Sequence, residues 1–118
     1  MPDTILGSLQ TTARLTSNGV STQSTVDVSG DQDWWQIDLV AGASYRFNMN
    51  AAIGSPLDSY LRLLDSSGAV LSYNDDSLNS LNSQLDYTAS SSGTYYLSAQ
   101  GYAGISIGGY ALSAALVT

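Results

Sequence analysis

Carboxylates stand close together at two places in this chain, although charged residues are few. Asp31 and Asp33 are separated by one residue in "GDQDWWQI", and Asp75 and Asp76 directly follow Asn74 in "SYNDDSLNS". In an extended segment the side chains of Asp31 and Asp33 fall on the same side, roughly 6.5 Å apart from the strand rise. That separation is too wide for a hydrogen bond between them, and it suits two ligands of one cation.

A hard cation such as Ca²⁺ is the chemistry that these side chains favour. Ca²⁺ takes about six to eight oxygen ligands from carboxylates, amide carbonyls and the backbone. Asp58 in "GSPLDSYL" adds a third acidic position, and the absence of His and Cys leaves zinc and copper without good ligands. The predicted calcium ligands are Asp31, Asp33, Asp58, Asn74, Asp75 and Asp76.

The same residues have an ordinary explanation, because Asp and Asn at strand ends are frequent turn formers. "NDDS" and "SPLDS" each fit a turn as well as they fit a ligand set. Asp65 in "LLDSSGAVL" is predicted to be a hairpin turn residue, and Asp27, Asp38 and Asp86 are predicted to lie on the solvent face of strands. The spacing matches neither an EF-hand loop nor the repeat of a calcium β-roll.

The composition excludes several function classes. The chain has 118 residues, ten acids that are all Asp, three bases that are all Arg, and a net charge of −7. It is long enough for one domain with its own core. Nucleic-acid binding needs a basic face, and a membrane span needs about 18 consecutive apolar residues, so we expect neither a nucleic-acid partner nor membrane insertion.

The residue types also argue against catalysis. Without His, Cys, Lys or Glu, the chain has no Ser-His-Asp triad, thiol nucleophile or lysine base. Two Asp carboxylates can in principle cleave glycosides, but a small sandwich without a deep cleft disfavours that activity. We therefore predict no catalytic residue and no enzyme activity.

Apolar residues alternate with polar ones at period two along most of the chain. "WWQIDL" places Trp35, Ile37 and Leu39 on one face of a strand, and a first strand is predicted near Ser24 to Val28. The same alternation recurs in "SYRFNMN", "YLRLLD", "QLDYTA", "TYYLSAQ" and "GYALSAALV", with short turn signals between. It predicts that Arg62 faces outward and that Tyr87 faces inward. The prediction is an all-β fold: an antiparallel β-sandwich, jelly-roll-like, of about eight strands, spanning 13–118 after an N-terminal segment 1–12.

Adjacent aromatic residues offer a second candidate site. Trp34 and Trp35 must face opposite ways in a strand, so one of them is expected in the core. Aromatic rings in such a fold mostly pack in the sandwich or lie half-buried with wet polar tips. The functional alternative is that Trp34, Tyr96 or Tyr102 forms part of a shallow platform for a peptide or sugar beside the cation.

Four segments together resemble a known family, the bacterial pre-peptidase C-terminal (PPC) domain. They are "GDQDWWQIDLVAGASYRFNM", "PLDSYLRLLDSSGAVLSYNDDS", "LNSQLDYTASSSGTYYLSAQGY" and "GGYALSA", in the family's order and covering nearly the whole chain. The opening "DTILGSLQTTARL" resembles the form found in serralysin-like proteases and large secreted calcium-dependent proteins. One departure is that Ser59 follows Asp58 where the family pattern has Asp-Pro.

The resemblance implies a jelly-roll-like sandwich appended to secreted bacterial enzymes and surface proteins, often calcium-binding and not itself catalytic. It makes the six predicted ligands the acidic motif positions. Related collagen-binding modules of clostridial proteases take calcium ligands from an acidic N-terminal linker, whereas this N-terminal segment has only Asp3, so we do not expect that layout.

The expected function is a monomeric, secreted, calcium-binding accessory module that works beside a protease domain or within an adhesin. The alternative is a calcium-dependent module that recognises extracellular peptide, collagen or glycan, and a third hypothesis is a passive spacer or chaperone-like segment of a protease precursor.

Overall fold

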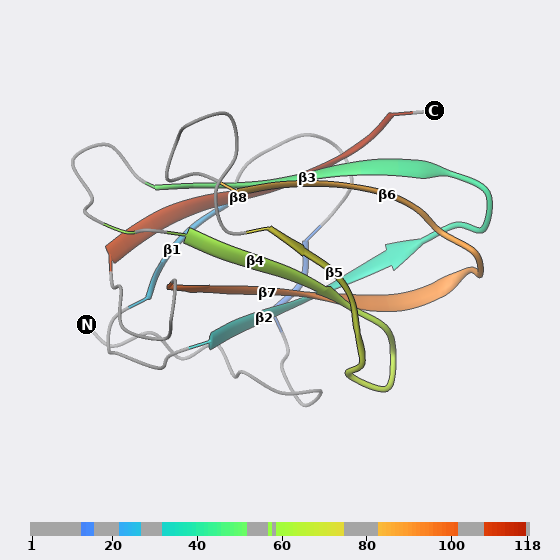
Figure 1. Ribbon diagram of the computed structural model, residues 1–118, viewed down its shortest axis with the longest axis horizontal. Coiled ribbons are helices and arrows are strands. Elements are labelled where there is room, and N and C mark those ends of the chain that lie inside the picture. Colours follow the sequence, from blue (N-terminus) through green and yellow to red (C-terminus); the bar gives the residue numbers. More distant parts are fainter. Residues whose placement is uncertain are drawn as a thin grey trace.

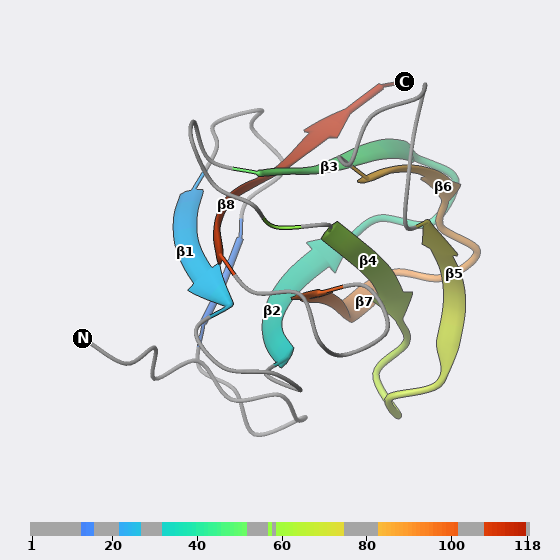
Figure 2. The same ribbon diagram turned by 60° about the vertical axis from the view of Figure 1, so that its left-hand side comes forward.

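The computed structural model describes residues 13–15, 22–26, 32–51, 57, 59–74, 83–101 and 108–117, which form eight strands in two facing layers (Figures 1 and 2). The strands are β1 Thr22–Val26, β2 Gln32–Leu39, β3 Ser44–Ala51, β4 Ser59–Leu64, β5 Val70–Asn74, β6 Ser83–Thr88, β7 Gly93–Gly101 and β8 Gly108–Leu116. No helix that could cross a membrane occurs in these ranges. The first strand begins at Thr22 rather than at the predicted Ser24, because its pairing with β8 already starts opposite Leu112.

Two four-stranded sheets, ordered β1-β8-β3-β6 and β2-β7-β4-β5, face each other. All of the strand pairs are antiparallel. This pair of strand orders is the double-sheet jelly roll, in which eight strands form two Greek keys. The predicted fold class is therefore confirmed, including its jelly-roll character.

The antiparallel pairing gives the sandwich two distinct ends. Odd-numbered strands finish and even-numbered strands begin at one end. The connections between them at this end are residues 27–31, 52–58, 75–82 and 102–107. These four connections carry Asp27, Asp31, Asp58, Asp75 and Asp76, half of the ten aspartates of the chain. We call this the acidic end. The opposite end, the turn end, has three connections, 40–43, 65–69 and 89–92, with Asp65 as their one acid.

The core lies between the sheets and follows the predicted alternation. The buried side chains come from alternate positions of β2, β3, β4, β6, β7 and β8 and include Trp35, Ile37, Leu39, Tyr45, Phe47, Met49, Leu61, Leu63, Leu85, Tyr95, Leu97, Ala99, Tyr110, Leu112 and Ala114. Each large apolar side chain buried in this way contributes roughly 1.5–3 kcal/mol. Tyr87, predicted to face inward, is half-buried and packs against this cluster.

The turn after β4 is built around the Asp65 side chain, as predicted. Its Oδ1 accepts hydrogen bonds from the Ser67 hydroxyl at 2.6 Å and from the amides of Ser67 and Ala69 at 2.9 and 3.0 Å. Gly68 has a positive φ of 89°, a backbone conformation that favours glycine. Asp38 and Asp86 are exposed on strands, as predicted, whereas Asp27 lies outside the described residues.

Candidate functional site

Asp33 points into the sandwich from the second position of β2. The structure buries it completely, and the Tyr110 hydroxyl of β8 donates a hydrogen bond to Asp33 Oδ2 at 2.5 Å. Trp35 Nε1 in turn donates to the Tyr110 oxygen at 3.1 Å. Because β2 and β8 belong to different sheets, these bonds join the two layers next to the acidic end.

Burial keeps Tyr110 in its neutral, hydrogen-bond-donating form. Removal from water raises the pKa of the Tyr110 hydroxyl far above its usual range, and the nearby Asp33 carboxylate raises it further. A neutral phenol can donate one strong hydrogen bond to a carboxylate. Tyr110 therefore solvates one side of a carboxylate that has no access to water.

Two more polar links cross the sandwich at the acidic end. The hydroxyls of Ser59 in β4 and Ser83 in β6 lie 2.7 Å apart, both buried between the sheets. Asn74 at the end of β5 accepts a hydrogen bond from the Gln84 amide of β6 at 3.3 Å through its Oδ1 atom. That atom is the one Asn74 would offer to a cation, so the side chain already has a structural role.

The remaining predicted calcium ligands lie beyond the described residues. These are Asp31, Asp58, Asp75 and Asp76. Their described neighbours Gln32, Ser59 and Asn74 all lie at the acidic end, where register pairs Gln32 with Gln100, Ser59 with Gly101 and Leu61 with Asn74. Within the described ranges, no three Asp residues group closely enough to hold a metal ion.

The outer face of the β2-β7-β4-β5 sheet carries two pairs of aromatic rings. Trp34 and Tyr96 have ring centroids 5.8 Å apart, and Tyr60 and Tyr73 have centroids 5.9 Å apart. Tyr96 has only 8% of its surface exposed, so it supports Trp34 rather than presenting a free ring. Tyr102, the third predicted platform residue, lies outside the described residues.

A network around Arg62 lies between these ring pairs. The Arg62 Nε atom donates to Gln100 Oε1 at 3.0 Å, and an Nη2 hydrogen goes to Gln32 Oε1 at 3.1 Å. Trp34 Nε1 also donates to Gln32 Oε1, and the Ser98 hydroxyl donates to Gln100 Oε1. Sequence reasoning placed Arg62 outward but did not connect it with Tyr60 and Tyr73, although the spacing of Tyr60 and Arg62 puts them on one face.

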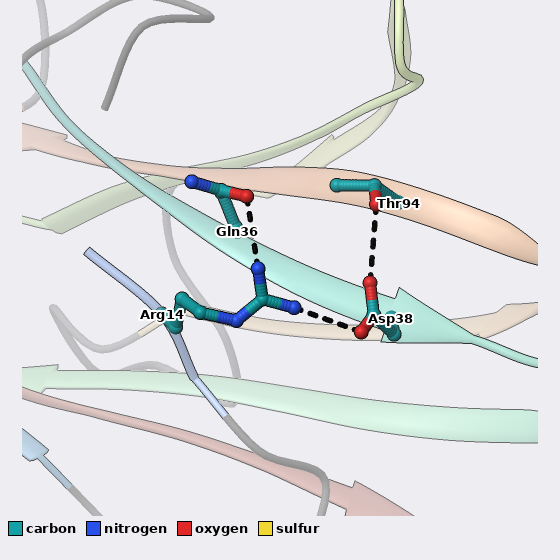
Figure 3. Close-up of polar contacts among 4 residues, drawn as sticks. All are labelled: Arg14, Gln36, Asp38 and Thr94. Atoms are coloured by element: carbon teal, nitrogen blue, oxygen red, sulfur yellow. Dashed lines mark hydrogen bonds and ion pairs between the residues drawn. The ribbon is translucent and has the colours of Figure 1, made fainter. Parts of the chain in front are cut away.

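A second arginine on the same face has an acidic partner (Figure 3). Arg14 forms an ion pair with Asp38 at 2.8 Å and also donates to Gln36 Oε1 at 3.0 Å. The other oxygen of Asp38 accepts a hydrogen bond from the Thr94 hydroxyl at 3.1 Å. Arg14 is therefore neutralised locally, whereas within the described ranges Arg62 contacts uncharged amide oxygens.

A shallow cavity of about 270 Å³ lies near the turn end, away from both groups. Its lining includes Tyr45, Tyr87 and the carboxylate of Asp86. Asp86 is bonded to Arg46 at 2.8 Å, which holds the pKa of that carboxyl below its usual range. This carboxylate is therefore committed to an exposed ion pair.

Two solved structures have a similar fold. The pre-peptidase C-terminal domain of collagenase from Bacillus anthracis aligns with a TM-score of 0.67 and 16% identity, over 86% of this chain and 92% of that chain. PliG from Aeromonas hydrophila, a periplasmic inhibitor of g-type lysozyme, aligns with a TM-score of 0.66 and 8% identity, over 88% of this chain and 96% of that chain. At these identities the likeness concerns the fold.

Among curated protein sequences, none matches the chain. A family model described as the bacterial pre-peptidase C-terminal domain matches residues 31–101, more than half of the chain, and includes the acidic motifs and the strands that position them. The chain therefore belongs to the bacterial pre-peptidase C-terminal domain family.

Proposed function

We propose that this domain is a calcium-binding, non-catalytic module of a secreted bacterial protein, attached to a protease or an adhesin. The observation that carries the proposal is the arrangement of strand ends. Four connections leave one end of the sandwich, and they hold half of the aspartates in the chain. The family is one of modules of secreted proteases, which supports an extracellular location.

The donor chemistry at the acidic end fits a hard cation. Aspartate, asparagine, serine and backbone oxygens are the groups that Ca²⁺ prefers, and the segments there supply all of them. Asp31 and Asp58 would provide carboxylates from two connections, and Asp75 with Asp76 would provide them from a third. Asp33, two residues after Asp31, would contribute its charge from inside the sandwich.

The energetic argument concerns the buried carboxylate and its acidic neighbours. Burying a charge is costly unless hydrogen bonds or an opposite charge compensate it, and the hydrogen bond that Tyr110 donates comes from a neutral group. Aspartates in adjoining connections would raise that cost by repulsion between like charges. A divalent cation at this end would reverse the sign of the interaction and stabilise the folded chain by mass action.

Thermal unfolding with and without calcium tests the proposal. Calcium at about 100 times its Kd should add about 2.7 kcal/mol, which corresponds to a Tm increase on the order of 10 °C. EGTA should abolish the increase, and Asp31→Ala should remove most of it. Asp38→Ala is the matched control, because it removes one exposed carboxylate from the sheet face and should leave the response intact. A wild-type Tm that is the same in calcium and in EGTA would contradict the proposal.

A second candidate function is recognition of an extracellular ligand. The outer face of the β2-β7-β4-β5 sheet favours it, because aromatic rings and the Arg62 guanidinium lie there together. Arg62 has no acidic partner among the described residues, and the rings are those of Trp34, Tyr60 and Tyr73. A glycan and peptide array screened in calcium and in EGTA would separate this function from that of a spacer, which should bind nothing.

A further inference from the structure

We propose that the outer face of the β2-β7-β4-β5 sheet binds a polysaccharide that carries carboxylates, with Arg62 as the residue that takes the carboxylate. The proposal rests on the second candidate function, ligand recognition, and specifies its ligand class and anchoring residue. It does not depend on the calcium site, since all of the residues that carry it lie on the described strands.

The hydrogen bonding of Arg62 leaves it able to bind an anion. A guanidinium has five N–H donors, and the described residues use two of them, through Gln100 and Gln32. These two bonds fix the plane of the guanidinium without neutralising its charge. A planar group held in this way is suited to a bidentate contact with a carboxylate.

The Gln32 amide beside Arg62 also presents a donor rather than an acceptor. Gln32 Oε1 accepts from both Arg62 and Trp34, and Gln100 Oε1 accepts from both Arg62 and Ser98. Because its oxygen already faces two donors, the amide nitrogen of half-buried Gln32 is directed away from Arg62, whereas Gln100 is buried and holds Arg62 from beneath. A ligand rich in acceptor oxygens, such as the carboxylate and hydroxyls of an acidic sugar, complements this surface.

The aromatic rings extend the face on both sides of Arg62. Register places Trp34, Ser98, Arg62 and Tyr73 in one row across the four strands. At the usual strand spacing, this row is roughly 14 Å long, enough for several sugar rings. Tyr73 is 64% exposed, so it presents an apolar ring to a ligand at one side, and the half-buried Trp34 lies at the other.

The sheet edge beside Trp34 argues for a sugar rather than an extended peptide. A peptide that adds a strand needs a free edge, and residues 13–15 already cover this edge of β2. The Leu15 amide donates to Gln36 O, and the Gln36 amide donates to Ala13 O, each at 2.8 Å. A ligand beside Trp34 must therefore lie across the face and contact side chains.

Titration calorimetry with defined saccharides tests the proposal on the whole chain. The probes are oligogalacturonate, alginate oligomers and hyaluronan oligomers, each beside a carboxyl-reduced neutral counterpart, together with an acidic peptide. We expect at least one acidic saccharide to bind in both calcium and EGTA, and to lose about tenfold or more in affinity when its carboxyls are reduced.

Two arginine variants make the test specific. Arg62→Gln should weaken binding by about tenfold or more, whereas Arg14→Gln on the same face should bind like the wild type. Tyr73→Ala, an exposed position, should weaken binding with the fold intact, which keeps the test decisive if Arg62→Gln unfolds. Binding that is unchanged in Arg62→Gln, binding of the neutral counterparts alone, binding of the peptide alone, or no binding of any saccharide would overturn the proposal. None of these outcomes changes the calcium-dependent Tm, so failure here and failure of the calcium proposal are distinguishable.

Discussion

The two ends of this sandwich are tied together in different ways. At the turn end, direct bonds between backbone groups join two connections: the Gly42 amide donates to Ala89 O at 2.8 Å, and the Ala89 amide donates to Ala43 O at 3.0 Å. Among the described residues of the acidic end, side chains make links between the sheets, through Asp33 and Tyr110 and through Ser59 and Ser83. Backbone links tolerate most side chains, whereas the acidic end depends on particular side chains and on their charge.

The largest effect should come from the buried carboxylate at the acidic end. Tyr110→Phe removes the donor to Asp33 and the acceptor of Trp35 Nε1, so we expect a loss of about 3 kcal/mol in the free energy of unfolding, measured by urea denaturation. Tyr95→Phe is the matched change near the turn end, where the hydroxyl donates to the Ser91 carbonyl at 2.7 Å. It should cost about 1 kcal/mol. Equal losses in the two variants would contradict the contrast between the ends.

A smaller effect is expected from the serine pair. Ser83→Ala breaks the buried link between the Ser59 and Ser83 hydroxyls and should lower the free energy of unfolding by about 1 kcal/mol. Ser92→Ala at the turn end removes an exposed acceptor of the Ala41 amide and should change stability by less than about 0.5 kcal/mol. A cost at Ser92 above that at Ser83 would show that hydroxyls matter more at the turn end.

The smallest effect should be a pH dependence at the turn end. Hydrogen bonds from the Ser67 hydroxyl, and then from the Ala69 and Ser67 amides, lower the pKa of Asp65 in the folded chain. Stability from this carboxylate is therefore fully present above its unfolded pKa, near 3.9, and is lost as pH falls through the lower folded value. Urea denaturation should find the wild type more stable than Asp65→Asn at neutral pH, with the difference shrinking below about pH 4. A difference that stays constant down to pH 2 would exclude this linkage.

Period-two alternation predicted the fold well because each face of a strand meets a single environment. The same parity that put Trp35 and Ile37 in the core also puts Asp33 there, yet aspartate is seldom buried, so its type suggested a cation ligand instead of a core residue. The Tyr110 hydroxyl, which donates a hydrogen bond to Asp33, is 77 residues away in β8. Only the pairing of the sheets brings the two side chains together.

The sheet face around Arg62 shows the same limit of sequence reasoning. Alternation predicted that Arg62 points outward, but its acceptors Gln32 and Gln100 come from β2 and β7. Those strands become neighbours of β4 only through the strand order of the jelly roll. Motif spacing therefore identified the acidic residues as candidate cation ligands. The hydrogen-bond network around Arg62 could be found only from the tertiary structure.

The most direct test of the central claim, that the acidic end binds a divalent cation, is a crystal structure of the chain grown in calcium and measured for anomalous scattering. We expect an ion at the acidic end, bound by carboxylates from at least two of the three connections that carry Asp31, Asp58 and Asp75–Asp76. Well-ordered carboxylates at that end, turned away from one another with no anomalous peak between them, would contradict the claim.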